Sequence, residues 1–254
     1  MAITIKSERE IELMAEAGKI LERVHNELEK ALRPGMSTKD IDTLGEEIIR
    51  SYGCIPSFLN YNGYPASICV SVNQEVVHGI PDKHRIIQEG DIVSLDAGVI
   101  YKGYHSDAAR THAVGKVSEE AKKLIQVTKE SFFEGIKFAK AGNHLFDISG
   151  AIGRYAEERG YGVVRDLCGH GIGTALHEAP EIPNYEVGRK GVRLRPGMTL
   201  AIEPMINIGT HEVDWLDDDW TVVTRDGSLS AHYENTILIT EGEPRILSLT
   251  CENE

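Results

Sequence analysis

The sequence contains few cysteines, and their spacing excludes the usual paired-cysteine motifs. Its four cysteines are Cys54, Cys69, Cys168 and Cys251, and no two of them have the CxxC spacing of zinc or redox sites. Disulfide frameworks belong to oxidising compartments and to chains that are denser in cysteine. The thiols are therefore expected to be free, in a protein located in the reducing cytoplasm.

Long apolar segments and an excess of positive charge are also absent. No apolar run approaches the roughly 20 residues that a membrane-spanning helix needs, and the charged first ten residues lack the apolar core of a signal peptide. The chain has 27 Lys and Arg against 40 Asp and Glu, a formal net charge of -13. Because nucleic-acid-binding proteins need a cationic surface, both membrane insertion and general nucleic-acid binding are disfavoured.

What the chain does contain is enough apolar sequence for a sizeable core. Of its 254 residues, 41% are hydrophobic and 26% are charged, which is typical of a globular protein. The patterns predict helices from the Ser7 capping box to Pro34 and over residues 37–52, 118–140 and 144–159. Strands are expected around 91–99, 111–117, 198–206, 220–226 and 235–240. No low-complexity linker divides these segments, so one α/β domain over residues 1–254 is expected.

Two parts of the chain are similar at a fixed offset. Residues 34–41 align with 141–148, and residues 90–96 align with 197–203, both at an offset of 107. The second alignment puts Asp96 on Glu203. Matches at one offset predict two similar α/β halves, with coincidence between short amphipathic segments as the alternative.

Two aspartates are expected to face each other across a hairpin. Residues 91–111 have the pattern of two strands joined by a turn near Tyr101 and Lys102. A two-residue turn there would put Asp96 directly opposite Asp107 on one face of the sheet. Like charges so close are destabilising unless one is protonated or a cation lies between them. The pair is therefore a candidate cation site.

Three further residues could complete a metal site. Glu203 lies in an apolar strand and Glu234 begins one. Acids in such positions usually point to solvent, and the alternative is that they face inward. Together with the two aspartates and His170, inward-facing glutamates would give four carboxylates and one imidazole. That set suits Mn, Fe, Co or Zn and is large enough for two ions.

The histidines other than His170 differ in whether their sequence context suggests a functional role. His78 precedes a glycine in a turn suited to presenting a side chain, and His177 follows His170 by seven residues. Gly171 and Gly173 favour a sharp backbone path between the two histidines. Surface positions are expected for His25, His84, His144 and His211, whereas His105, His112 and His232 are ambiguous.

Five separated motifs resemble, in order, those of the methionine aminopeptidases: VVHGIPD, SLDAG…HSDAART, GHGIGTALHEAP, AIEPM and SAHYENT. The similarity extends from Ser7 to Leu249 and includes each acid and histidine proposed above for the site. It implies the pita-bread α/β fold, in which two pseudo-symmetric halves form a curved antiparallel sheet covered by helices. The span of 64 residues from His170 to Glu234 leaves no room for the helical insertion of type II enzymes, so the chain resembles the bacterial type I form.

The resemblance also implies a role for each residue. Two divalent metal ions (Co, Mn, Fe or Zn) would be bound by Asp96, Asp107, His170, Glu203 and Glu234, with Asp107 and Glu234 bridging the ions. Asp96 would complete the shell of one ion, and His170 and Glu203 that of the other. Glu203 would be the general base, and His78 and His177 would be catalytic groups that contact substrate. The wall of the methionine pocket would include Tyr61, Tyr64, Cys69, His78 and Trp220, for each of which core packing is the alternative.

The implied activity is removal of the initiator methionine from nascent proteins when the second residue is small, by a water activated at a dinuclear site. A cytoplasmic monomer is expected. Transient ribosome contact is expected through Lys122, Lys123, Lys129, Lys137 and Lys140, with a solvated helix face as the alternative. The acidic segment 214–220 is expected to be a solvated loop.

Two other functions stay open at this point. One is an Xaa-Pro peptidase, which would share the fold and similar ligands but usually carries a separate N-terminal domain. The other is a binding module without catalysis, which would typically have lost ligands that are all present here. Leu176 stands where relatives often have an aromatic residue, and Phe58 stands near where some relatives have a cysteine. These departures leave the shape of the methionine pocket open.

Overall fold

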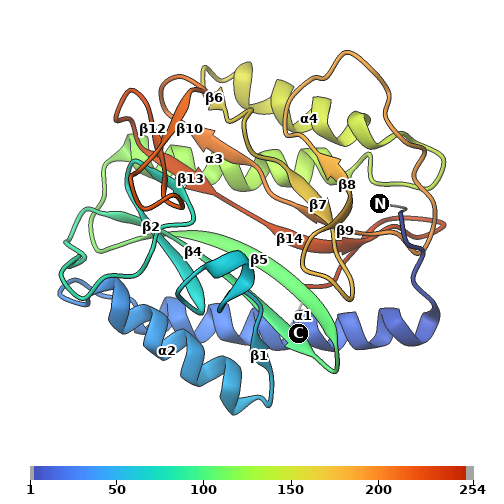
Figure 1. Ribbon diagram of the computed structural model, residues 1–254. Coiled ribbons are helices and arrows are strands. Elements are labelled where there is room, and N and C mark those ends of the chain that lie inside the picture. Colours follow the sequence, from blue (N-terminus) through green and yellow to red (C-terminus); the bar gives the residue numbers. More distant parts are fainter. Residues whose placement is uncertain (1–2, 250–254) are drawn as a thin grey trace.

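Four α-helices follow the amphipathic segments of the sequence in the computed structural model, which describes residues 3–249. They are α1 (Glu8–Ala31), α2 (Thr38–Ser51), α3 (Glu119–Ile136) and α4 (Leu145–Glu157). Ser7 and Glu10 form the predicted capping box at the start of α1. Figure 1 shows α1 and α2 along the bottom of the molecule and α3 and α4 along the top, with the strands between them.

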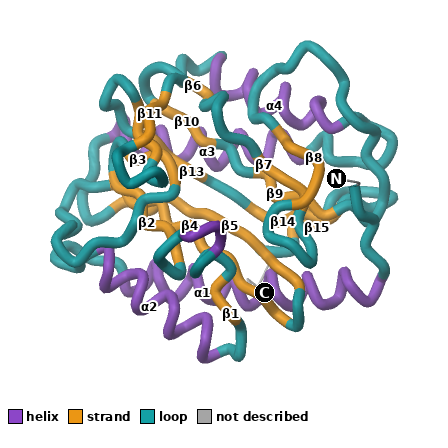
Figure 2. The backbone as a smooth tube through the Cα atoms, in the orientation of Figure 1, coloured by secondary structure: helices purple, strands orange, loops and turns teal. Residues whose placement is uncertain are grey.

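All the strand pairs of the described residues are antiparallel. Figure 2 shows the strands in orange between the helices in purple. One sheet contains β1 (Ile55–Pro56), β2 (Ile68–Val72), β4 (Ile92–Tyr101) and β5 (Tyr104–Ala113). A second has the order β15 (Arg245–Ile246), β14 (Asn235–Leu238), β9 (Thr199–Ile202), β7 (Gly169–Gly171) and β8 (Glu178–Ile182). Two smaller sheets contain β13 (Ser230–His232), β10 (Met205–Asn207) and β6 (Gly162–Val163), and β11 (Val213–Trp215), β12 (Val222–Thr224) and β3 (Glu75–Val77).

The two halves repeat at the predicted offset. Helix α4 begins at Leu145, 107 residues after α2 begins at Thr38. Strand β9 begins at Thr199, 107 residues after β4 begins at Ile92. Each half also has its own core, because α1 and α2 pack on β2 and β4, and α3 and α4 pack on β9 and β14. These equivalences confirm the internal duplication.

The turn of the β4–β5 hairpin lies one residue later than predicted. Tyr101 pairs with Tyr104, so the turn residues are Lys102 and Gly103, with φ of 49° and 87°. The two-residue turn that matches the twist of the strands needs positive φ at both positions, and glycine adopts it without strain. The position of Gly103 therefore decides the register.

This register corrects the expected pairing of the two aspartates. Asp96 is opposite Ala109, and Asp107 is opposite Gly98, so the expectation of direct opposition is wrong. The partners differ by two residues, which is one full side-chain period of a strand. Both carboxylates therefore still lie on one face of the hairpin, as diagonal neighbours.

The expected strands around the two glutamates are interrupted. Glu203 and Pro204 separate β9 from β10, because proline has no N–H for a sheet ladder. Tyr233 and Glu234 separate β13 from β14, although neither of them is a proline. Since β9 pairs with β14 and β10 pairs with β13, the chain crosses between two sheets at each glutamate. The side chains of Glu203 and Glu234 therefore lie where the two sheets meet, and neither has to point to solvent.

Three smaller expectations can be compared with the structure. Cys54, Cys69 and Cys168 are free thiols, and Cys251 lies outside the described residues. The expectation that His25 is at the surface is wrong, since it is 4% exposed and its Nε2 lies 2.8 Å from the carbonyl oxygen of Ala108. Only residues 111–113 of the expected strand 111–117 belong to a strand.

None of the helices between residues 3 and 249 has the length and apolar character that crossing a bilayer would require.

Candidate metal and peptide site

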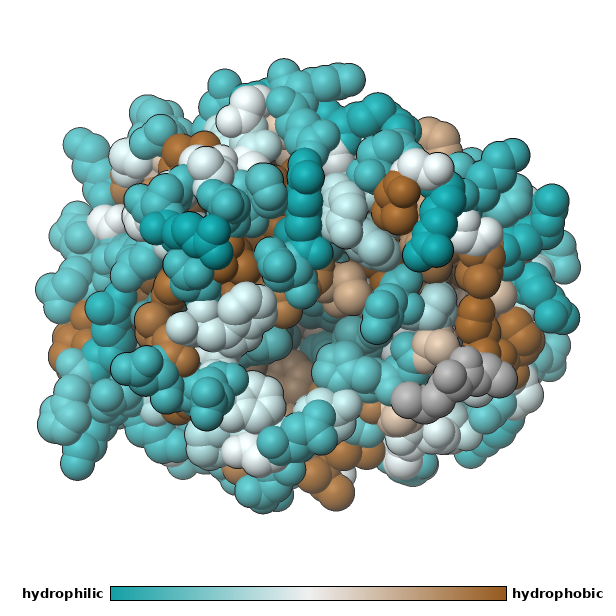
Figure 3. All heavy atoms as spheres, turned by 45° about the horizontal axis from the view of Figure 1, so that its top comes forward, coloured by the Kyte–Doolittle hydropathy of each residue, from teal (hydrophilic) through white to brown (hydrophobic). Residues whose placement is uncertain are grey.

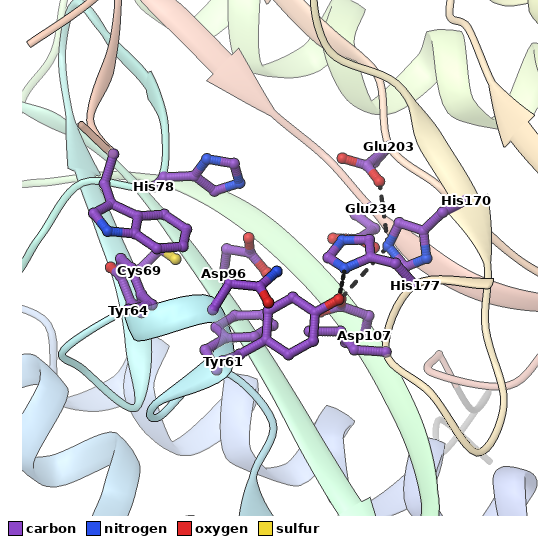
Figure 4. A pocket seen from close by; sticks show the side chains of 14 residues that line it. Tyr61, Tyr64, Cys69, His78, Asp96, Asp107, His170, His177, Glu203 and Glu234 are labelled. Carbon is purple, nitrogen blue, oxygen red and sulfur yellow. Dashed lines mark hydrogen bonds and ion pairs between the residues drawn. The ribbon is translucent and has the colours of Figure 1, made fainter.

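A cavity of about 180 Å³ brings together the site residues that the sequence suggests. Its lining includes all five expected metal ligands, both expected catalytic histidines and all five residues expected in the methionine pocket, namely Asp96, Asp107, His170, Glu203, Glu234, His78, His177, Tyr61, Tyr64, Cys69 and Trp220. Figure 3 shows the molecule hollowed near the centre of one face, and Figure 4 shows the side chains that line this cavity. We call it the site cavity.

Four carboxyl groups share the floor of the site cavity with few partners. One oxygen each of Asp96, Asp107 and Glu234 is buried without a hydrogen-bond partner among the described residues. Burial raises the pKa of Asp96 to about 7, and burial together with the neighbouring carboxylates raises the pKa of Asp107, Glu203 and Glu234 well above the ordinary range. Such a cluster is stable as carboxylates only when cations neutralise it. The orphaned oxygens thus fit a site for divalent metal ions.

His170 is oriented for metal binding. Its Nδ1 lies 2.9 Å from the carbonyl oxygen of Gly171, to which it can donate its proton. Its Nε2 then carries a free lone pair and lies 3.9 Å from Oδ2 of Asp107 and 3.6 Å from Oε1 of Glu203. Ligand atoms of Asp107, His170 and Glu234 all lie within 4.8 Å of one another, which is close enough for one ion to contact all three. A backbone hydrogen bond that fixes the tautomer is typical of metal-binding histidines.

Backbone contacts hold the acids in place. Thr236 Oγ1 accepts a hydrogen bond from the amide of Asp107 and donates one to its carbonyl oxygen, both at 2.9 Å. Arg110 donates to the carbonyl oxygen of Glu234, and Asn184 Nδ2 donates to that of Glu203 at 3.1 Å. Local sequence does not single out Thr236, Arg110 and Asn184, because the backbone atoms that they hold belong to distant segments.

The two histidines that are expected to be catalytic are held in different ways. His177 Nδ1 lies 2.7 Å from the hydroxyl of Tyr61, so when that hydroxyl donates, Nε2 carries the proton and can donate to substrate. His78 has φ of 59°, a left-handed conformation that is uncommon outside glycine and concentrates at functional sites. Burial lowers the pKa of His78 to about 4 and also lowers that of His177, so both rings are neutral at pH 7.

The glycines near His170 act by close approach rather than by unusual backbone angles. A Cβ on Gly171 would lie 2.2 Å from the carbonyl oxygen of Ala179, and one on Gly173 would lie 2.5 Å from Oε1 of Glu178. Neither glycine has a left-handed φ, so both act through the space that a missing side chain leaves. They let β7 and the loop after it pack tightly against β8, which keeps the ring centroids of His170 and His177 only 4.1 Å apart.

The end of the site cavity away from His170 is apolar. Tyr64, Cys69 and Trp220 line it, and the rings of Tyr64 and Trp220 meet edge to face with centroids 5.1 Å apart. Phe58 and Leu176, the two departures from the family pattern, line the same cavity. In Figure 4 Tyr64 and Cys69 lie to the left of the acids, and His170 and His177 lie beside Glu203, Glu234 and Asp107 on the right of the view. The cavity thus has an apolar end and a metal-binding end.

Sequence reasoning missed Asn62 and undervalued His232. Asn62 lines the cavity from a short 3-10 turn, and nothing in its local sequence signals this. His232 is 2% exposed, and its Nε2 lies 4.0 Å from Oε2 of both Glu203 and Glu234.

The acidic segment 214–220 is exposed over residues 214–219, as expected, while Trp220 turns into the cavity.

Comparison with known proteins gives one consistent result. The model of metallopeptidase family M24 matches residues 12–241. A methionine aminopeptidase of Clostridium acetobutylicum is 58% identical over 250 residues, which cover 98% of this chain and 100% of that protein. The crystal structure of a methionine aminopeptidase from Thermotoga maritima is 47% identical, with a TM-score of 0.96, and the match covers 98% of this chain and 100% of that one.

The Xaa-Pro branch is more distant. An Xaa-Pro dipeptidase from Bacillus anthracis is 27% identical, with a TM-score of 0.77. The match covers 97% of this chain but 62% of that one, so the dipeptidase contains a large part with no counterpart here. Identity and coverage both favour the aminopeptidases over the Xaa-Pro enzymes.

Proposed function

Since the chain belongs to metallopeptidase family M24, and within it to the methionine aminopeptidases, it removes N-terminal methionine, and we propose that it does so with two divalent metal ions bound by the acids and His170 of the site cavity. The fold is the pita-bread fold of this family. The observation that carries the proposal is the set of four buried carboxyl groups around His170, several of whose oxygens have no hydrogen-bond partner among the described residues.

The five proposed ligands divide between the two ions. Asp107 and Glu234 would be shared by the two ions, Asp96 would hold one of them, and His170 and Glu203 would hold the other. This division is supported by the proximity of His170 Nε2 to Asp107 and Glu203. Oxygen ligands with one imidazole and no thiolate are compatible with Mn, Fe, Co and Zn.

The chemistry is hydrolysis of the first peptide bond. When bound, the divalent ions lower the pKa of a water molecule and polarise the scissile carbonyl. Glu203 accepts a proton from the attacking water and delivers it to the leaving amide nitrogen. His177, with its proton on Nε2, donates a hydrogen bond to the carbonyl oxygen as negative charge develops there. His78 lies to the left of the acids in Figure 4 and would contact the scissile amide from that side.

The apolar end of the site cavity suits the methionine side chain. Tyr61, Tyr64, Cys69, His78 and Trp220 form its wall in this proposal, and the rigid aromatic pair of Tyr64 and Trp220 supplies surface for a thioether. We further propose that the space for the second residue is narrow, so that Gly, Ala and Ser are accepted and Leu and Lys are not.

The setting of the reaction is also part of the proposal. Residues 1–254 act as a single catalytic domain and a monomer in the cytoplasm, where nascent chains carry their initiator methionine. Ribosome contact would involve Lys122, Lys123, Lys129, Lys137 and Lys140. Three of these are in ion pairs, Lys122 with Glu119, Lys137 with Glu134 and Lys140 with Glu243, which reduces the free positive charge of the patch. Ribosome cosedimentation that is unaffected by reversing the five charges would refute this contact.

The activity can be tested with short peptides and defined metals. Chelator-treated protein reloaded with Mn, Fe, Co or Zn should release methionine from Met-Ala-Ser and leave Ala-Pro peptides intact. Cleavage of Ala-Pro peptides in preference to Met-Ala-Ser, or full activity in excess chelator, would contradict the proposal.

A further inference from the structure

Two more hollows continue from the site cavity across the surface. The first, of about 620 Å³, shares His170 and His177 with the site cavity and is also lined by Cys168, Glu178, Glu181 and Arg189. We call it the flank cavity. The second, of about 350 Å³, shares Arg189 with the flank cavity and is lined by Phe138, Phe146 and Glu186 among others. We call it the distal groove. Shared lining residues therefore join the three hollows into one path that begins at the reaction centre.

The direction of this path matches the direction in which a polypeptide must leave. The apolar end of the site cavity is proposed for the methionine side chain, so the rest of the substrate has to pass the reaction centre. His170 and His177 line the flank cavity as well as the site cavity, and Figure 4 shows them on the side opposite Tyr64 and Cys69. Figure 1 shows that the strands involved, β7 and β8, lie toward α4 and away from the β4–β5 hairpin.

The charged side chains along the path differ in whether they already have partners. Glu178 is paired with Lys6, whose Nζ lies 2.6 Å from its Oε2. The side chain of Glu181 is exposed and makes no hydrogen bond or ion pair with any residue between 3 and 249. The same is true of Arg189, whose guanidinium lies over the ring of Phe146, 5.4 Å from its centroid. By contrast, Arg154 in the distal groove is held by Glu186 at 2.6 Å.

Arg189 is therefore a positioned cation with unused hydrogen-bond donors. Stacking on Phe146 restricts the guanidinium plane, which reduces the entropy lost when a partner binds. A planar guanidinium with free donors pairs well with a carboxylate, often through two parallel hydrogen bonds. The chemistry of this position thus selects an acidic side chain.

We propose that the flank cavity and distal groove form a downstream subsite for the polypeptide substrate, in which Arg189 binds an acidic side chain a few residues after the methionine. This inference rests on the proposed function, because it requires a polypeptide in the site cavity. Exposed ion pairs contribute about 0.2–1 kcal/mol, so the expected preference for an acidic over a neutral residue is about 1.4- to fivefold in kcat/KM.

The test uses amidated heptapeptides that begin Met-Ala-Ser, with Asp or Lys placed in turn at positions 4, 5 and 6 of a serine background. Each kcat/KM is divided by that of Met-Ala-Ser-amide, so that a general loss of activity cancels. In the wild type, Asp should be preferred to Lys at one or more of these positions, and the preference should shrink at high salt. Arg189→Ala should abolish it, and Arg189→Glu should invert it.

A matched control is available two residues after the end of α4. Arg159 is also an exposed arginine stacked on an aromatic ring, 3.5 Å from the centroid of Tyr155, and it lines none of the three hollows. Arg159→Glu should leave the wild-type preference intact. The inference is overturned if the wild type shows no preference at any of the three positions, or if Arg189→Glu and Arg159→Glu change it equally. Failure of the wild type to cleave Met-Ala-Ser-amide at all would instead refute the proposed function.

Discussion

Replacing Asp96 by asparagine should make the metal-free protein more stable while weakening its metal binding. Asp96 is buried, and one of its oxygens has no hydrogen-bond partner among the described residues. Burial raises the pKa of its carboxyl from 3.8 to about 7, which means that the folded, metal-free state disfavours the carboxylate. Asparagine keeps the shape of the side chain, removes the charge and brings an amide that can donate to Asp107.

The magnitude follows from the pKa difference. A pKa difference of about three units destabilises the folded, metal-free wild type by at most roughly 4 kcal/mol. This destabilisation is fully present above pH 7. Because the folded-state pKa is the higher one, the folded protein binds the proton first, and wild-type stability falls as the pH rises from about 4 to about 7. The advantage of Asp96→Asn should therefore be near zero at pH 4 and reach about 2–4 kcal/mol at pH 8, equivalent to roughly 4–16 °C in Tm.

The assay is thermal and urea unfolding of both proteins in excess chelator between pH 4 and pH 8, repeated with saturating Mn. Added metal should reverse the order, since the wild type gains more from binding ions that neutralise its carboxylates. Asp217→Asn, in the exposed acidic segment, is the control and should show neither effect. A variant that is less stable than the wild type in chelator at pH 8 would refute the reasoning that these carboxyl groups are strained without metal.

Four other predictions follow from the structure. Asp107→Asn should sharply weaken metal binding and turnover, and wild-type metal content in this variant would contradict a bridging role. In a series of Met-X-Ser peptides, Gly, Ala and Ser at X should be cleaved and Leu and Lys should not; equal rates across the series would refute a narrow second subsite. Trp220→Ala should raise KM for Met-Ala-Ser more than it lowers kcat if the ring forms the methionine pocket, and an unchanged KM would reassign it to packing. Burial holds the pKa of His25 well below 6.5, so the unfolded chain binds a proton at this residue before the folded chain does. The free energy of unfolding should therefore fall as the pH drops below 6.5, by up to about 1.4 kcal/mol per pH unit. His25→Gln should remove this part of the pH dependence, as measured by urea unfolding.

Helices and the internal duplication were predictable from local sequence, because amphipathic spacing and capping residues act within a few positions. Thr38 and Leu145 begin equivalent helices at the predicted offset, and Ser7 caps α1 with Glu10. The motifs also indicated every lining residue proposed for metal binding. The roles of the site residues were assigned from the resemblance of five motifs, and not from residue spacing alone.

Other features could not be predicted because they depend on partners distant in sequence. The β4–β5 turn is an exception, because its signal is local: Gly103 suits the second turn position and so decides which residue each aspartate faces. His25 was expected at the surface because its local pattern does not show that a carbonyl of β5 covers it. Likewise, His232 became part of the site only through the crossing of β13 and β14 between two sheets.

The central claim is that the buried acids and His170 bind two metal ions, while His177 acts on the substrate. The most direct test is calorimetric metal titration of the chelator-treated wild type, His170→Ala and His177→Ala, with single-turnover cleavage of Met-Ala-Ser at saturating metal. The account predicts two ions bound by the wild type and by His177→Ala, with cleavage in the latter slowed by about 10²–10³. His170→Ala should need higher metal concentrations. Loss of metal in His177→Ala, with full affinity retained in His170→Ala, would contradict the account.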